Sequence, residues 1–194
     1  MKRVFVLKET AVVVSHWYEV GERDEEHGVR IEVRTLAHPP RTGTGSAAQV
    51  INVDGIILRV DIFDVLGKEP GNLERAHYHW RFDGRTPSDR AWDNSLREDP
   101  FAWLGERLSE LPSLAKTAGI IVPDVDAEAA DLRAAVPEIV AVAKSLAATE
   151  CTAPSACLDA TKESRHLVLD ILAEVRGEAG PDPRIELAGS TGSW

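Results

Sequence analysis

The stretch VRIEVRT, residues 29–35, alternates between apolar and charged side chains until its final threonine. This alternation is typical of a β-strand with one buried face, because successive side chains of a strand point to opposite faces of the sheet. The valine and isoleucine positions are therefore expected in a core. Arg30, Glu32 and Arg34 are expected on the opposite face.

Other segments of the first half have a similar strand composition, rich in Val, Ile and aromatic residues and separated by polar or Gly/Pro stretches. Within one of them an Asp54-Gly55 turn signal predicts two short strands folded back on each other. Because no helical pattern separates consecutive strands, an antiparallel sheet is favoured. The predicted strand segments are residues 4–7, 11–20, 29–36, 48–64 and 75–82.

The second half has helical periodicity. A helix is expected to begin at Asp99-Pro100 and to end at Pro112, because Asp caps free amides and Pro is tolerated in the first turn. Pro137 is expected to kink or restart the next helix. The predicted helical regions are 99–111, 127–148 and 162–176.

The predicted fold is α+β: an antiparallel sheet of about five strands, with three to four helices packed on one face. We expect one domain over residues 1–180, mainly strands in 1–98 and mainly helices in 99–177. Residues 181–194, which are rich in Pro, Gly and Ser, are expected to form a flexible tail.

Composition limits the classes of function. The chain has 194 residues and a net charge of −10, which argues against nucleic-acid binding by the whole surface. No apolar run approaches the roughly 20 residues of a membrane-spanning helix, and no signal peptide is recognised, so a cytoplasmic protein is expected. Cys151 and Cys157 are expected to stay reduced, and two cysteines without a neighbouring His are too few for a zinc knot.

The segment RAHYHWRF, residues 75–82, is the most informative motif. If it is one continuous strand, its Ala and aromatic positions share a core face, and its Arg and His positions share the other. The same alternation over residues 57–64 places Arg59 and Asp61 on that second face. An acidic protein would thus gather arginines and two histidines on one side of its sheet.

One hypothesis is a binding site for a small anionic ligand or an acidic peptide, because arginine offers a planar fork of donors to carboxylate or phosphate. Trp17, Tyr18 or Trp92 would provide a stacking wall. The competing interpretation is an ordinary wet sheet face, whose charges meet water or pair across strands. The predicted ligand-binding residues are Arg59, Arg75, His77, His79 and Arg81.

An alternative hypothesis is a metal-dependent hydrolase or lyase. His77 and His79 lie two residues apart on a strand, so they can share one zinc, iron or manganese ion with Asp61 as third ligand. The flanking arginines would oppose a cation. His16 is a weaker candidate ligand, because its neighbours at the same parity are expected to face the core.

The sequence leaves two further points open. The polar loop 83–94 would either close over the sheet face through Asp89, Arg90 and Asp93 or, as we favour, connect into the next helix with Trp92 on the sheet. An oligomeric interaction subunit, such as a homodimer, is a third possible function, because small residues allow close helix packing. These residues are Ala129, Ala134, Ala143 and Ala147.

Overall fold

A computed structural model describes residues 1–20, 25–38, 51–66, 68, 71, 73–84 and 86–149. Cys151, Cys157, the predicted helix 162–176 and the predicted tail 181–194 lie outside these residues. The described part belongs to one compact unit, Met1–Cys151. None of its helices combines the length and the apolar character needed to cross a membrane.

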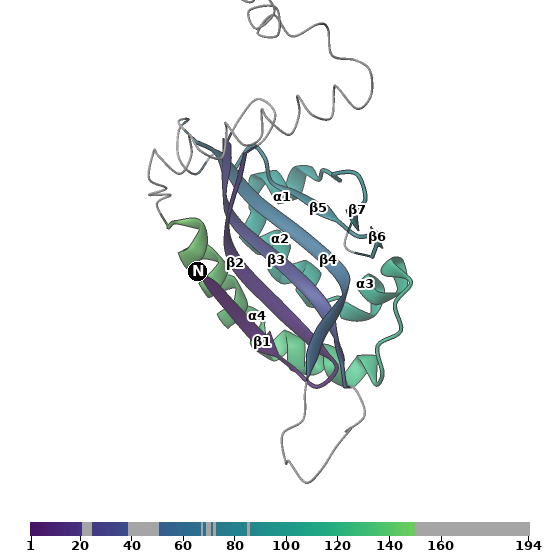
Figure 1. Cartoon of the computed structure of the whole chain (residues 1–194). Helices are drawn as coiled ribbons and strands as arrows, with labels where there is room; N and C mark the ends of the chain where they lie inside the picture. The colour runs from purple at the N-terminus through teal and green to yellow at the C-terminus, as the bar shows by residue number, and fades with distance from the viewer. Residues whose placement is uncertain are drawn as a thin grey trace, which may run out of the picture. The chain divides into compact units, whose positions relative to one another are not determined.

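The first half of the chain forms a five-stranded antiparallel sheet in the order β1-β2-β3-β4-β5, which confirms the predicted fold class (Figure 1). Each strand pairs with the next one along the chain, as expected where no helix intervenes. A separate two-stranded ribbon, β6 (Phe82–Asp83) with β7 (Thr86–Pro87), follows. The sheet strands are β1 (Lys2–Val6), β2 (Thr10–Val20), β3 (Glu25–Ala37), β4 (Asn52–Val65) and β5 (His77–His79).

The described part of the second half forms four helices. Asp93 caps the first and Asp99 the second, each by accepting a hydrogen bond from a backbone amide two or three residues later. Pro100 occupies the first position of the second helix, as predicted. The helices are α1 (Asn94–Glu98), α2 (Pro100–Leu108), α3 (Leu111–Ala118) and α4 (Val125–Ala147).

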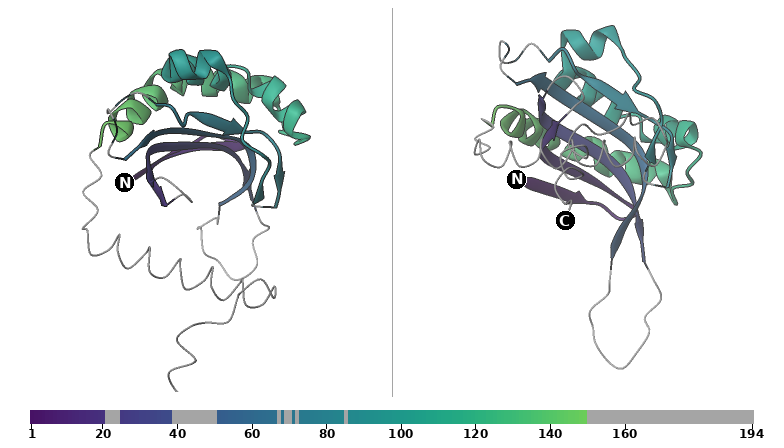
Figure 2. Two further views of the ribbon diagram at one scale, coloured as in Figure 1. Left: turned by 90° about the horizontal axis from the view of Figure 1, so that it is seen from above. Right: turned by 45° about the horizontal axis from the view of Figure 1, so that its top comes forward.

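The helices cover one face of the sheet, which curves so that they lie on its convex side (Figure 2). Alternate residues of the strands meet the helices in one apolar core, as the alternation predicts. Val14, Ile31, Val60 and Tyr78 form one cross-strand row of this core. The remaining strand residues face the concave side.

Several local predictions are wrong. Residues 52–65 form one strand despite Asp54-Gly55, because the far end of β3 pairs with them through two register shifts. Pro112 lies in the first turn of α3 instead of ending a helix. The helix α4 runs through Pro137 and does not restart there, whereas a kink at Pro137 stays a prediction. Trp80 is 41% exposed instead of buried, because β5 ends at His79 and the alternation stops there.

A buried carboxylate joins the two halves of the unit. Glu128 of α4 accepts hydrogen bonds from the backbone amides of Glu9 and Thr10, at 3.0 and 2.8 Å, and from the Thr10 hydroxyl at 2.6 Å. These donors lie at the turn between β1 and β2. The turn is therefore fixed by a residue far along the chain.

Candidate metal centre

The concave side of the sheet carries two rows of paired polar side chains, which we call the polar face. The rows follow the strand register, so each residue lies directly opposite its neighbours on the adjacent strands. They cross β3, β4 and β5. One row is Arg30, Asp61 and His77, and the other is Glu32, Arg59 and His79.

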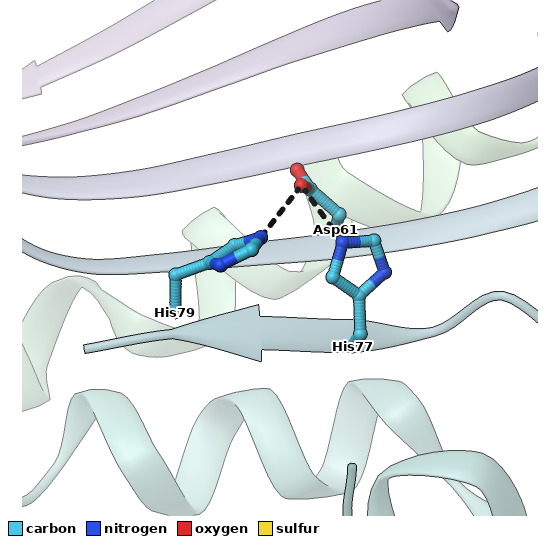
Figure 3. Close-up of side chains that lie close together, drawn as sticks. All are labelled: Asp61, His77 and His79. Atoms are coloured by element: carbon cyan, nitrogen blue, oxygen red, sulfur yellow. Dashed lines mark ion pairs between the residues drawn. The ribbon is translucent and has the colours of Figure 1, made fainter. Parts of the chain in front are cut away.

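Three side chains of these rows converge on one point (Figure 3). The Nε2 atoms of His77 and His79 lie 3.4 and 4.0 Å from Oδ2 of Asp61. One ligand atom from each residue lies within 4.8 Å of the other two. The side chains of His77, His79 and Asp61 are 2%, 7% and 1% exposed, so the polar face is not a wet surface at this point.

The backbone fixes which nitrogen of each imidazole carries the proton. Nδ1 of His77 lies 2.6 Å from the carbonyl oxygen of Arg75, and Nδ1 of His79 lies 2.7 Å from that of Ser88. A carbonyl oxygen can only accept, so each Nδ1 donates. The opposite tautomer would place a lone pair against each carbonyl at these distances. In the neutral rings, both Nε2 atoms therefore direct a lone pair toward Asp61.

Burial keeps both imidazoles neutral. Loss of hydration lowers the pKa of His77 from 6.5 to about 4 and also lowers the pKa of His79. The carbonyl bonds and Asp61 oppose this effect without reversing it. At neutral pH the cluster therefore contains two neutral nitrogen donors and one carboxylate, the protonation states in which these groups bind metals.

The convergence of three lone-pair-bearing atoms requires a positively charged partner or a proton donor. Among the described residues, no hydrogen-bond donor contacts either Nε2 atom. Oδ2 of Asp61 accepts a hydrogen bond from Arg30, so the two Nε2 atoms are the acceptors without a protein donor; a water molecule could donate to both, and a divalent cation could bind both together with Oδ2. Metal-binding histidines usually donate their other ring N–H to a carbonyl or carboxylate oxygen, as the Nδ1 atoms of His77 and His79 do here.

Arg30 fixes the orientation of Asp61. Its Nε donates to Oδ1 at 2.6 Å, and its Nη2 donates to Oδ2 at 3.0 Å, so the carboxylate is gripped by a planar fork. The ring of Trp17 lies 3.9 Å from the guanidinium carbon. Each carboxylate oxygen has more than one lone pair, so Oδ2 can serve Arg30 and a metal together.

The other arginines of the region also have carboxylate partners. Arg59 and Arg34 both pair with Glu32, at 2.8 and 3.0 Å. Arg75 and Arg90 each lie 3.5 Å from Oε1 of Glu26. These carboxylates partly offset the guanidinium charges, so the arginines repel a cation bound at the cluster less strongly.

The structure brings four of the five residues predicted to bind an anion into this network or the cluster, but not Arg81. That residue is exposed beyond the end of β5, and no ion pair joins it to the rest of the described chain. His16 also does not join the cluster, because it pairs with Val29 at the parity that faces the helices. Tyr18 shares that parity, so it cannot line the polar face as predicted.

Aromatic rings border the cluster. The rings of Trp92 and Phe63 lie 5.4 and 6.2 Å from that of His77, and Phe82 lies 6.4 Å from His79. Trp92 reaches this position because Ala91 forms a β-bridge with Tyr78. The tryptophan thus packs against the sheet, as favoured above.

The loop 83–94 contributes little else to the polar face. Asp93 caps α1 and accepts a hydrogen bond from Nε1 of Trp103, so it belongs to the helical layer. Arg90 reaches Glu26.

Sequence reasoning missed the role of Arg30. Its place on the charged side of a strand was predictable, but its pairing with Asp61 depends on strand register. No family model, curated protein or solved structure matches the chain. The chemistry of the site therefore rests on its own geometry.

Proposed function

We propose that the protein is a metal-dependent enzyme whose centre consists of Asp61, His77 and His79. The observation that carries this proposal is the convergence of two fixed Nε2 lone pairs on a buried carboxylate oxygen. The two Nε2 atoms lack a donor among the described residues, so this arrangement favours a group that can serve both of them, and a divalent ion can do so while also binding Oδ2 of Asp61.

The ligand types narrow the choice of metal. Two imidazoles and one carboxylate suit zinc, iron and manganese, whereas calcium and magnesium prefer oxygen ligands alone. Sets of two histidines and one carboxylate occur at catalytic zinc centres and at non-haem iron centres.

The number of ligands supports catalysis over a purely structural role. Structural zinc sites are usually closed by four protein ligands, whereas three ligands leave a position for water or substrate. A metal ion lowers the pKa of bound water toward neutrality and polarises a bound carbonyl or phosphoryl oxygen. Hydrolase or lyase chemistry follows from these two effects, with Arg30 as the residue that orients the carboxylate ligand.

The alternative functions are less well supported. A site that binds an anion through arginines alone stays a prediction, but Arg59 and Arg75 already have carboxylate partners. An interaction subunit also stays a prediction. Two of the alanines on which it was based, Ala129 and Ala143, are buried in the protein's own core.

The experiment is elemental analysis of tag-free protein after exposure to zinc, iron or manganese, followed by removal of unbound metal. We expect close to one ion per chain in the wild type and in His38→Ala, whose histidine is exposed and lies outside the cluster. The His77→Ala/His79→Ala variant should lose the ion while keeping its circular dichroism spectrum. If that variant does not fold, His79→Gln replaces it, because a single polar change at the margin of the cluster disturbs the core less.

Two results would overturn the proposal. One is wild-type protein that holds none of the three metals under these conditions. The other is a folded His77→Ala/His79→Ala variant that keeps the same metal content as the wild type.

A further inference from the structure

A carboxylate of β4 holds two residues of the link that leads from β4 to β5. Asp64 is buried near the end of β4, and each of its two oxygens accepts a hydrogen bond from a backbone amide of the link. Oδ2 accepts from Gly71 and Oδ1 accepts from Leu73, both at 2.7 Å. Hydrogen bonds to an ionised acceptor are about twice as strong as those between neutral groups. Asp64 therefore fixes this part of the link against the end of β4.

The second of these residues has a backbone conformation that needs such support. Leu73 has a φ angle of +50°, in the left-handed region that residues other than glycine seldom adopt. Its carbonyl oxygen accepts a hydrogen bond from the amide of Ala76 at 3.0 Å, which closes a turn over residues 73–76. Asp64 thus holds the first residue of that turn.

The turn leads directly to one of the candidate metal ligands. Arg75 is the third residue of the turn, and its carbonyl oxygen lies 2.6 Å from Nδ1 of His77. This contact keeps the ring proton on Nδ1 and directs Nε2 toward Asp61 (Figure 3). Because the turn sets the direction of the carbonyl, a chain of contacts runs from Asp64 through the turn to the ring of His77.

Strand pairing alone gives β5 little support. This strand has three residues, and three residue pairs join it to β4. His79 has an anchor of its own, because its Nδ1 donates to the carbonyl oxygen of Ser88, in the chain that follows β5. The two imidazoles are therefore fixed from different sides: His77 by the turn before β5, and His79 by the segment after it.

We propose that Asp64 is a positioning residue of the metal centre, because it holds the turn whose carbonyl fixes the tautomer and orientation of His77. That His77 binds a metal rests on the proposed function, whereas the effect of Asp64 on the imidazole can be observed without metal. Loss of a partner that orients a metal-binding histidine typically weakens metal binding by about 10–100-fold. Asp64 acts one step further from the ligand, so we expect the lower end of that range.

The test compares Asp64→Asn with Glu128→Gln in the full chain. Both substitutions replace a buried carboxylate that accepts hydrogen bonds from two backbone amides, but Glu128 acts at the β1–β2 turn. Long-range ¹H–¹⁵N NMR spectra of the metal-free proteins show which nitrogen of each imidazole carries the proton. In Asp64→Asn we expect His77 to lose its purely Nδ1-protonated signal and His79 to keep it. In Glu128→Gln both histidines should match the wild type.

Metal titration gives the second measurement. Asp64→Asn should bind cobalt(II), followed by its visible absorption, about tenfold more weakly than the wild type. Glu128→Gln should bind it as tightly as the wild type, although this variant also loses hydrogen bonds to a buried carboxylate. If Asp64→Asn does not fold, Asp64→Glu replaces it, because it keeps the charge and both acceptor oxygens while moving them by one methylene group.

The outcomes separate this inference from the proposed function. Equal His77 signals and equal cobalt affinities in the two variants overturn the role given to Asp64 and leave the metal centre intact. Equal changes at His77 and His79 in Asp64→Asn also overturn it, because the effect would then not pass through the turn. Wild-type protein that binds no cobalt, zinc, iron or manganese overturns the proposed function, and the NMR comparison still decides whether Asp64 positions His77.

Discussion

Removing the cation that grips Asp61 should destabilise the metal-free protein strongly. Arg30→Met leaves a carboxylate that is 1% exposed without its fork of two hydrogen bonds. Breaking a buried ion pair from one side typically costs about 3–5 kcal/mol, because the remaining charge is uncompensated. For a chain of this size, each kcal/mol lowers the melting temperature by about 2–4 °C, so we expect a decrease of about 6–20 °C.

The assay is thermal and urea unfolding in the presence of a chelator, followed by the same measurement with added metal. Lys68→Met is the control, since Lys68 pairs with Glu74 at a surface where both side chains are about half exposed; it should cost less than about 1 kcal/mol. Metal should restore part of the loss in Arg30→Met, because it supplies a positive charge to Asp61. A metal-free Arg30→Met protein as stable as Lys68→Met would refute this account of the buried pair.

Two further perturbations test other parts of the structure. Without metal, the free energy of unfolding should fall as the pH decreases from about 6.5 to about 4, because the unfolded chain protonates His77 before the folded one does. The pKa difference corresponds to about 3 kcal/mol. In urea unfolding, His77→Gln should show a smaller decrease over this pH range. Glu128→Gln should cost about 1–3 kcal/mol in urea unfolding, because three hydrogen bonds lose their charged acceptor. Glu138→Gln, on the exposed side of the same helix, should be neutral, and equal losses in the two variants would contradict the role given to Glu128.

Alternation along strands predicted the fold class and the side on which the candidate ligands lie. A period of two residues is a local property, so residues 29–35 and 57–64 show it without any knowledge of their neighbours. The same period placed Asp61, Arg59, His77 and His79 on one face. Their meeting additionally requires that β4 pair with β5, which the short link between them favours.

The failures arise where partners far along the chain decide the outcome. Asp54-Gly55 would form a turn in isolation, but pairing of Leu36 with Val53 keeps the strand extended. Trp80 follows a strand that is only three residues long, and its exposure depends on where the pairing with β4 stops. The Arg30 fork on Asp61 depends on register, which alternation alone does not specify.

The hydrogen bonds from Glu9 and Thr10 to Glu128 also constrain the order of folding. Thr10 and its acceptor are separated by 118 residues, so during synthesis the β1–β2 turn leaves the ribosome long before its partner exists. Until α4 is made and docks, these amides are solvated by water. Contacts of such long sequence separation slow folding, because the intervening chain must be ordered before they form. We therefore expect the sheet to acquire its full protection from hydrogen exchange at the β1–β2 turn only after α4 has been synthesised.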